Sequence, residues 1–252
     1  MKVLITGASS GIGLSFAKYC NELGYNLILV TRNKEKLEEL TKNFKVEKKI
    51  INIDLNNIND LNKLYLLTKD EDIDILINNA GFGLYGEFSK TNLTRELEMI
   101  DINIKAVHVL TKLYLNDMIK KNRGYILNVS SSAGFGSGPL MATYYATKSY
   151  VLHLSEAINY ELKKENSEVF VATLCPGPVA TNFNNIAGVT FNDKEISSDY
   201  VAKYAIDLLL KKRVIIIPTF KMKLVTFLRR IASRNFILKL TYNYQTKKSA
   251  KN

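Results

Sequence analysis

The chain has 252 residues, 46% of them hydrophobic, which is enough to bury one large core. Its two cysteines, Cys20 and Cys175, stand far apart and its two histidines are too few for a usual zinc site, so we expect reduced thiols and no metal. Twelve basic residues follow Asp207, the last acidic residue, and outweigh the net charge of +11. Residues 1–210 are therefore nearly neutral, which excludes a nucleic-acid-binding surface there.

The N-terminus has three consecutive apolar residues, Val3–Ile5, before the chain turns at Thr6-Gly7. Three are too few for the apolar region of a signal peptide. No stretch approaches the roughly 20 apolar residues that span a bilayer. We therefore expect a cytoplasmic protein.

Short apolar runs alternate with longer helical patterns along residues 1–218, which is typical of βαβ units around a parallel sheet. Strands are expected at 3–6, 26–31, 49–53, 73–77, 124–129, 168–174 and 214–217. Helices are expected at 12–23, 34–43, 59–68, 93–118, 142–165 and 196–211. The pattern predicts one α/β domain over 1–218, built on a doubly wound parallel sheet of about seven strands with helices on both faces.

Residues 219–252 form a C-terminal extension of different character. Within 219–242 the apolar residues near one helical face are Leu224, Phe227, Leu228, Ile231 and Leu238. Most basic residues lie elsewhere, which predicts a basic amphipathic helical tail. Three interpretations stay open: a helix packed on the domain or on a second subunit, a peripheral contact with an anionic membrane, and, least favoured, a nucleic-acid contact. Residues 243–252 are polar and are expected to fray.

A glycine-rich turn joins the first strand to the first helix, and it reads Thr6-Gly7-Ala8-Ser9-Ser10-Gly11-Ile12-Gly13. Glycines permit a tight turn and a close approach of the backbone, while a helix N-terminus offers free N–H groups to a pyrophosphate. Because the turn opens an alternating α/β chain, it predicts dinucleotide binding.

The end of the second strand indicates which dinucleotide binds. An acidic residue there would accept hydrogen bonds from the adenosine ribose, but the chain has Thr31 followed by Arg32. The guanidinium of Arg32 is suited to a 2′-phosphate. NADP(H) is therefore favoured, with NAD(H) as the second option.

Four tyrosines are followed four positions later by a lysine, and of these only Tyr144, paired with Lys148, has a serine thirteen residues upstream, Ser131. On a helix, residues four apart share a face. A free phenol with a pKa near 10 is a poor base at neutral pH, so we expect the Lys148 ammonium to lower the pKa of Tyr144. Ser131 is suited to donate a hydrogen bond to a substrate oxygen.

Over residues 1–218 the chain resembles the short-chain dehydrogenase/reductase family. The matching motifs are Thr6–Gly13, Asn78-Asn79-Ala80-Gly81, Asn103, Ser131, Tyr144-x-x-x-Lys148 and Pro176-Gly177-Pro178-Val179-Ala180-Thr181. The resemblance implies a Rossmann-type fold and an NADP-preferring single-domain enzyme.

The resemblance also implies roles for four catalytic residues. Tyr144 is the general acid/base, and Lys148 tunes its pKa and holds the nicotinamide ribose. Ser131 orients the substrate oxygen. Asn103 holds a water that links Lys148 to bulk solvent.

The family's cofactor contacts carry over to further positions. The adenine pocket is implied at Asp54 and Leu55. The adenosine ribose side is implied at Asn79, Ala80 and Gly81. The nicotinamide turn is implied at Pro176, Gly177, Val179 and Thr181. Asn78 is expected to bridge neighbouring strands.

These residues together predict an NADP(H)-dependent oxidoreductase that reduces a carbonyl group, assembled as a homodimer or homotetramer. A non-catalytic NADP-sensing or interaction module on the same fold is the alternative. The expected substrate wall is Phe135, Pro139, Leu140, Met141 and 182–196. This wall is mixed apolar and shows no charge clamp, which favours a lipophilic ketone, aldehyde or acyl chain.

Overall fold

Seven parallel strands form the central sheet of the computed structural model, which describes residues 1–188 and 195–247. They are β1 (Lys2–Thr6), β2 (Asn26–Thr31), β3 (Lys48–Asn52), β4 (Ile75–Asn78), β5 (Tyr125–Val129), β6 (Phe170–Leu174) and β9 (Ile215–Ile216). Their order is β3-β2-β1-β4-β5-β6-β9, so the chain winds outward in both directions from the β1–β4 pair. The predicted doubly wound α/β fold is confirmed.

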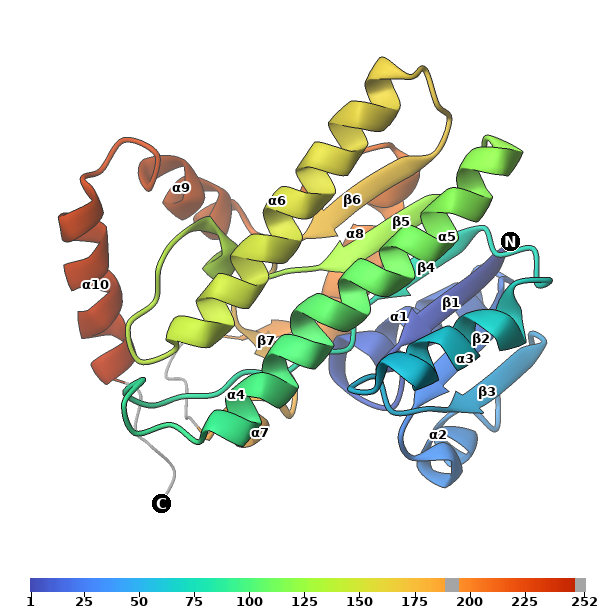
Figure 1. Cartoon of the computed structure of the whole chain (residues 1–252), viewed down its shortest axis with the longest axis horizontal. Coiled ribbons are helices and arrows are strands. Elements are labelled where there is room, and N and C mark those ends of the chain that lie inside the picture. Colours follow the sequence, from blue (N-terminus) through green and yellow to red (C-terminus); the bar gives the residue numbers. More distant parts are fainter. Residues whose placement is uncertain (189–194, 248–252) are drawn as a thin grey trace.

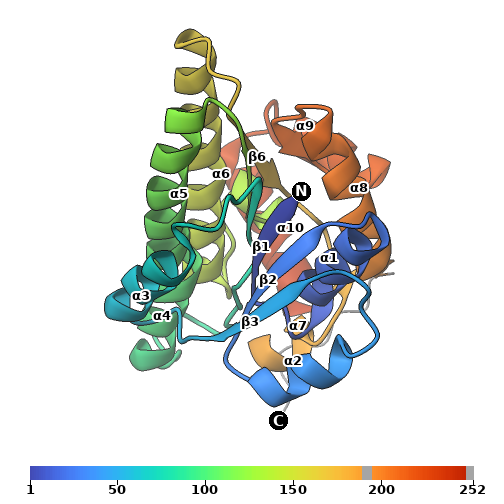
Figure 2. The same cartoon turned by 90° about the vertical axis from the view of Figure 1, so that its right-hand side faces the viewer.

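Helices cover both faces of this sheet (Figure 2). One face carries α1 (Gly11–Glu22), α2 (Lys34–Leu40) and α8 (Ser198–Leu210). The other carries α3 (Ile58–Thr68), α5 (Val107–Lys121) and α6 (Ala142–Lys164). Two hydrophobic clusters, one on each side, hold the layers together.

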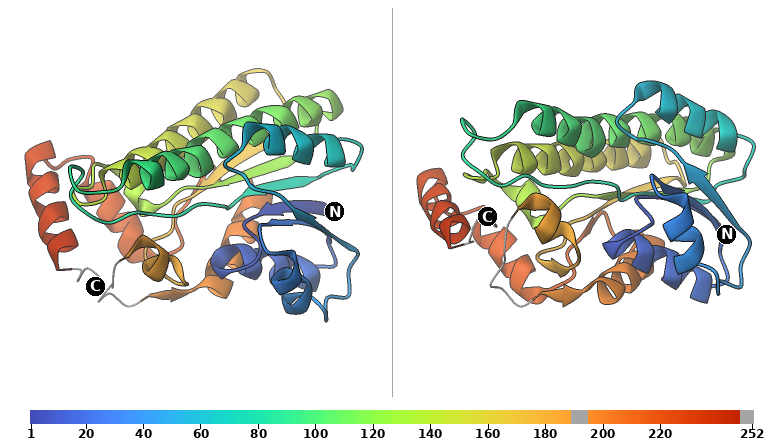
Figure 3. Two further views of the ribbon diagram at one scale, coloured as in Figure 1. Left: turned by 60° about the horizontal axis from the view of Figure 1, so that its bottom comes forward. Right: turned by 90° about the horizontal axis from the view of Figure 1, so that it is seen from below.

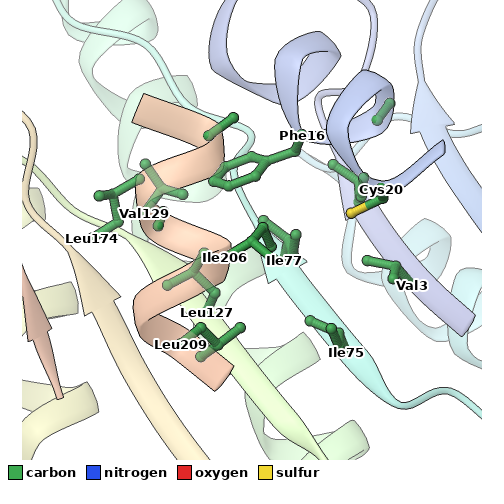
Figure 4. Close-up of a cluster of buried hydrophobic side chains, with 14 of the residues drawn as sticks. Val3, Phe16, Cys20, Ile75, Ile77, Leu127, Val129, Leu174, Ile206 and Leu209 are labelled. Atoms are coloured by element: carbon green, nitrogen blue, oxygen red, sulfur yellow. The ribbon is translucent and has the colours of Figure 1, made fainter. Parts of the chain in front are cut away.

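The central strands are apolar on both faces because both faces are covered. Along β1, Val3 and Ile5 pack toward α1 and α8, whereas Leu4 packs toward α3 and α5. Figure 4 shows part of the first cluster, in which Phe16 of α1 and Ile206 and Leu209 of α8 lie with Ile77 of β4 and Leu127 of β5. The predicted strand 73–77 is shorter in the structure, where β4 begins at Ile75.

The single helix predicted over 93–118 is interrupted in the structure. It consists of α4 (Leu93–Ile100), a π-helical segment (Asp101–Ala106) and α5. A π-helix contains an extra residue per turn and is frequent at functional sites. Here it contains Asn103, whose buried side chain bonds outside its own helix.

The helix predicted over 196–211 begins later in the structure. Ile196 and Ser197 form a short strand, β8, that pairs with β7 (Val179–Ala180), so the predicted helix 196–211 starts only at Ser198. The Ser197 side chain accepts the Tyr200 N–H at 3.2 Å and caps α8. A short helix, α7 (Phe183–Ala187), follows β7.

The C-terminal extension forms two helices, α9 (Phe220–Leu228) and α10 (Arg234–Thr246), at one end of the molecule (Figure 1 and the red segments of Figure 3). Thr219 and Ser233 cap them. The expectation that residues 243–252 fray is wrong for 243–246, because Gln245 is fully buried and hydrogen-bonded; 248–252 lie outside the described residues. Within the described ranges, no helix is both long and apolar enough to cross a bilayer.

Candidate active site

The glycine-rich turn lies at the carboxyl ends of β1 and β4, where the strand order reverses. Gly7 and Gly11 have φ values of +66° and +51°, in the left-handed region that favours glycine. The first helical bond of α1 runs from the Leu14 N–H to the Ser10 carbonyl at 3.2 Å. The N–H groups of Gly11 and Ile12, which line the cavity, are therefore not used by the helix and are available to an anion.

Gly13 packs closely against the glycine-rich turn and the Asn79 side chain. A Cβ added to it would lie 2.2 Å from the Gly7 carbonyl oxygen and 2.5 Å from the Asn79 side-chain nitrogen. Gly13 does not line the large cavity that begins at this turn. The sequence prediction made Gly13 a cofactor contact, whereas its position in the structure indicates that it lets α1 pack closely on the turn.

Thr6 holds the segment after β4 against this turn. Its hydroxyl accepts the N–H groups of Asn79 at 3.0 Å and Ala80 at 3.1 Å. The Asn79 side chain in turn donates to the Thr6 carbonyl at 3.0 Å. Asn79, Ala80 and Gly81 line the cavity as a result.

The adenosine end of the cavity is lined by Arg32, Asp54 and Leu55. Arg32 is exposed at the end of β2, and no salt bridge ties it to a carboxylate among the described residues. Lys36, in the first turn of α2, lines the same end. The sequence prediction missed Lys36, although a basic residue in the first turn of the helix that follows the second strand is a usable signal.

Tyr144, Lys148 and Ser131 meet in the middle of the cavity. Both helical residues come from α6, and Ser131 follows β5, where its hydroxyl accepts the Ala133 N–H at 3.1 Å. The Lys148 ammonium is buried, donates to the Val129 carbonyl at 2.9 Å and lies 5.9 Å from the centre of the Tyr144 ring.

Burial dominates the titration of this pair. It raises the pKa of Tyr144 to about 12, against a hydrogen bond with Ser131 that lowers it. Burial also lowers the pKa of Lys148 to about 8. The expectation that the pKa of Tyr144 is lowered is wrong for this structure, because burial raises it and Ser131, not Lys148, is the group that opposes the rise.

Asn103 is fully buried and joins two parts of the site. Its side chain accepts the Phe82 N–H at 3.1 Å and donates to the Phe82 carbonyl at 2.9 Å and the Thr147 hydroxyl at 3.0 Å. Gly81 lies between Asn103 and Lys148, because a Cβ on Gly81 would be 2.8 Å from the Asn103 side-chain oxygen and 3.3 Å from the Lys148 nitrogen. Asn103 thus fixes the distance between the 79–82 segment and α6, with its side-chain amide already bonded to protein.

Asn78 bridges strands as expected. Its side-chain nitrogen donates to Asn128 of β5 at 2.9 Å and to Thr111 of α5 at 3.1 Å. Asn128 donates onward to Ser155 of α6 at 3.0 Å. This buried network holds α5 and α6 on the sheet below the site.

The turn after β6 closes the cavity opposite the glycine-rich turn. Its lining residues are Pro176, Gly177, Pro178, Val179 and Thr181. The Pro176 carbonyl accepts the Ser132 N–H at 2.8 Å, which ties this turn to the segment after Ser131. A Cβ on Gly11 would lie 3.0 Å from a Thr181 methyl carbon, so the two turns nearly touch.

A family model described as short chain dehydrogenase matches residues 1–188. The chain belongs to the short-chain dehydrogenase family. A very-long-chain 3-oxoacyl-CoA reductase of Anas platyrhynchos is 33% identical over 207 residues, which are 79% of this chain and 65% of the relative. An inactive hydroxysteroid dehydrogenase-like protein 1 of Homo sapiens is 33% identical over 71% of this chain and 56% of the relative. The chain thus spans less than two thirds of the length of both curated relatives.

The solved structure of a short-chain dehydrogenase from Sphingobium yanoikuyae in complex with NADPH is similar throughout the fold. Its TM-score is 0.81 at 30% identity, with 87% of this chain and 88% of that chain covered. The seven-stranded sheet is thus that of a short-chain dehydrogenase.

One cavity of about 1340 Å³ runs from the glycine-rich turn of this short-chain dehydrogenase to α9 and α10. Of the predicted substrate wall, Met141 and the described residues Asn182, Phe183, Ile186, Glu195 and Ile196 line it. Residues 189–194 lie outside the described ranges. Phe135, Pro139 and Leu140 are not part of the lining. At Leu140 the chain turns (φ +65°), and the Leu140 carbonyl accepts the Gly86 N–H at 2.8 Å.

The C-terminal helices supply the far wall, including a cation that the sequence prediction missed. Arg229, the residue directly after α9, donates to the Ser132 carbonyl at 3.3 Å and is hydrogen-bonded to the Tyr145 hydroxyl. Tyr145 also accepts a bond from Gln245 at 2.9 Å. Burial raises the pKa of Tyr145, and Arg229 opposes that rise. The usable signal was that Arg229 lies opposite the apolar stripe of its helix.

Proposed function

We propose that the chain is an NADP(H)-dependent oxidoreductase that transfers hydride between nicotinamide and the carbon of a carbonyl or secondary alcohol. One observation carries this proposal: Tyr144 and Ser131 line the same continuous cavity as the glycine-rich turn. A bound nicotinamide supplies the hydride in reduction and accepts it in oxidation. The remaining chemistry is proton transfer and orientation by this chain.

The residues of the chain divide that chemistry. The Tyr144 hydroxyl, whose pKa is raised to about 12, keeps its proton at neutral pH and donates it to the carbonyl oxygen in reduction. Ser131 donates a hydrogen bond to the same oxygen and stabilises the developing charge. Lys148, with a pKa of about 8, holds a proton that restores Tyr144. Asn103 fixes the segment opposite Lys148 through Phe82.

The residues present fit a dinucleotide with a 2′-phosphate. A Cβ on Gly7 would lie 2.9 Å from the Ala80 Cα, so this tight turn requires glycine, and a backbone without a side chain suits the close approach of a pyrophosphate. Arg32 and Lys36 place two cations at the adenosine end. The similar dehydrogenase that binds NADPH supports NADP(H) over NAD(H).

The substrate class we propose is a lipophilic ketone, aldehyde or 3-ketoacyl compound. The wall beyond Tyr144 is mostly apolar, with Phe183, Val225, Leu228 and Phe236 among its residues. The name of the 33% identical 3-oxoacyl-CoA reductase supports an acyl chain. Arg229 adds one polar point to this wall, suited to a carbonyl or carboxylate of the substrate.

The domain and subunit arrangement belongs to the same proposal. Residues 1–218 form the catalytic domain, and 219–252 form an extension whose helices complete the cavity wall. A homodimer or homotetramer would form through α5 and α6, which lie side by side on one face of the molecule (Figure 1). Their exposed apolar side chains include Ile119, Tyr150 and Tyr160.

A second function is a non-catalytic NADP-binding module, favoured by the relative whose name calls it inactive. Tyr144→Phe separates the two functions. As an enzyme, the variant loses about 100-fold or more in NADPH oxidation over a ketone, aldehyde and 3-ketoacyl panel while it still binds NADPH. The matched control is Tyr160→Phe, since Tyr160 and Lys164 have the same spacing on α6 but lie away from the cavity. Binding without turnover by the wild type on every substrate supports the module.

A further inference from the structure

Helix α9 turns its apolar stripe away from the protein. Phe220 is 80% exposed, Phe227 59% and Ile231, just after the helix, 73%. At 100° per residue these positions lie within one narrow stripe, together with Leu224. The opposite face of α9 carries Val225 and packs toward the cavity. An amphipathic helix normally buries its apolar stripe, so this one is oriented toward a partner.

The surroundings of the stripe are cationic. No acidic residue follows Asp207 in the sequence. The exposed basic side chains of the two helices and their flanks are Lys221, Lys223, Arg230, Arg234, Lys239 and Lys247. In the described part of the chain, no salt bridge pairs any of them with a carboxylate. The partner of the stripe must therefore present both an apolar layer and negative charge.

The stripe continues into the cavity. Leu228, Phe236 and Leu240 are each about half exposed, at 47%, 55% and 53%, and each also lines the cavity. An apolar path thus leads from the outer surface of α9 and α10 to the wall opposite Tyr144. Both helices lie at one end of the molecule, where a flat surface can approach them (Figures 1 and 3).

We propose that α9 and α10 lie on the surface of an anionic phospholipid bilayer, with Phe220, Phe227 and Ile231 inserted at the level of the headgroups. A bilayer offers the required combination of acyl chains and negative headgroups. A second copy of this chain fits less well, because a two-fold contact through the same face would bring the cations of both copies together. This proposal concerns binding alone and does not depend on the proposed reaction.

A single tryptophan reports on the insertion directly, because the chain contains none. Phe227→Trp is expected to shift its emission to shorter wavelength on vesicles that contain phosphatidylglycerol in phosphatidylcholine, and to shift less on phosphatidylcholine alone. Each basic residue near the surface contributes about fivefold in affinity at low salt, so binding should weaken steeply at about 1 M NaCl. The control is Leu66→Trp on α3, 62% exposed in the wild type, whose emission should stay unchanged.

Flotation of the full chain with the same vesicles tests the stripe itself. Phe220→Ser combined with Phe227→Ser should weaken partition about tenfold or more, since two large apolar side chains no longer insert. Neither residue lines the cavity, so NADPH binding should be retained. The control pair is Leu66→Ser with Leu67→Ser, both exposed on α3.

Two outcomes overturn the proposal. The first is equal flotation of the wild type and the double serine variant on anionic vesicles. The second is absence of vesicle binding together with a change from dimer to monomer in the double serine variant, measured by light scattering. The second outcome assigns the stripe to a contact between copies.

Discussion

The hydroxyl of Tyr145 accepts a hydrogen bond of 2.9 Å from the side-chain amide of Gln245, a residue one hundred positions later in the chain. The backbone carbonyl of Gln245 also accepts a hydrogen bond of 3.0 Å from the Tyr85 hydroxyl. Gln245 is fully buried, so α10 is fastened to the cavity wall through a polar residue rather than through its exposed apolar side chains. The far wall of the cavity depends on this attachment.

Gln245→Leu should loosen α10. The substitution removes one donor to the Tyr145 hydroxyl, which keeps its hydrogen bond with Arg229, so the expected cost is that of one hydrogen bond, about 0.5–1.5 kcal/mol. Amide hydrogen exchange in Arg234–Thr246 should then become about 2-fold to 10-fold faster, while exchange in β1 stays unchanged. Asn243→Leu is the control, since Asn243 is exposed on the same helix. Equal exchange in α10 of all three proteins would contradict the role of Gln245.

The local parts of the site could be predicted from sequence because their signals are local. The glycine-rich turn, the strand 26–31 and the pair Tyr144 and Lys148 each depend on a few neighbouring residues. The contacts of Arg229 and Gln245 could not, because they join segments about one hundred residues apart. They exist only once the C-terminal helices are packed against the rest of the chain.

The error about Tyr144 has a similar origin. The spacing to Lys148 indicated a nearby charge, but burial depends on the tertiary structure and acts on both groups. The interruption of the predicted helix 93–118 could not be predicted from local sequence either. Asn103 there bonds to Phe82 and Thr147, which are distant in sequence, and the helix accommodates these bonds with a π-helical segment.

Arg32→Ser should change the preference between cofactors. Loss of charge-assisted bonds to a 2′-phosphate costs about 1.5–3 kcal/mol, which weakens NADPH binding roughly 10-fold to 100-fold. NADH binding should stay nearly the same, because NADH has no 2′-phosphate. Fluorescence titration with both cofactors measures the ratio. Lys34→Ser is the control, since Lys34 is exposed, pairs with Glu38 at 3.6 Å and does not line the cavity.

A shared role for Lys36 is tested in the same way. Lys36→Ser should also weaken NADPH binding, by less than Arg32→Ser, because an ammonium makes a single contact where a guanidinium makes two. If Arg32→Ser left the ratio of the two cofactor affinities unchanged, the adenosine end would have to discriminate by other residues.

The buried ammonium of Lys148 should make stability depend on pH. Its pKa in the folded chain is lowered to about 8 from an ordinary value of 10.5. Between these values the unfolded chain holds a proton that the folded chain has released, so the free energy of unfolding rises with pH in this window. The slope contributed by one such group is at most about 1.4 kcal/mol per pH unit.

Comparison with Lys148→Met isolates this contribution. The buried Cys20, Cys175 and Tyr144 have raised pKa values and destabilise the fold as pH rises above their ordinary values, but they do so in both proteins. Urea unfolding at about pH 8 and about pH 10, near the two ends of this window, should therefore show the wild type gaining stability relative to the variant. A constant difference between the two proteins would mean that Lys148 is not charged differently in the folded and unfolded chains.

Gly13→Ala should be far more costly than Gly24→Ala, although both replace a glycine near α1. At Gly13 the new Cβ would lie 2.2 Å from the Gly7 carbonyl oxygen. That oxygen cannot move away without displacing the glycine-rich turn, so overpacking of about 3 kcal/mol or more is expected, with loss of NADPH binding. At Gly24 the φ is +74° but no atom lies within 4 Å, so only backbone strain of about 1–2 kcal/mol is expected. Urea unfolding followed by circular dichroism gives both values, and equal costs would show that the Gly7 carbonyl yields easily to the added methyl group.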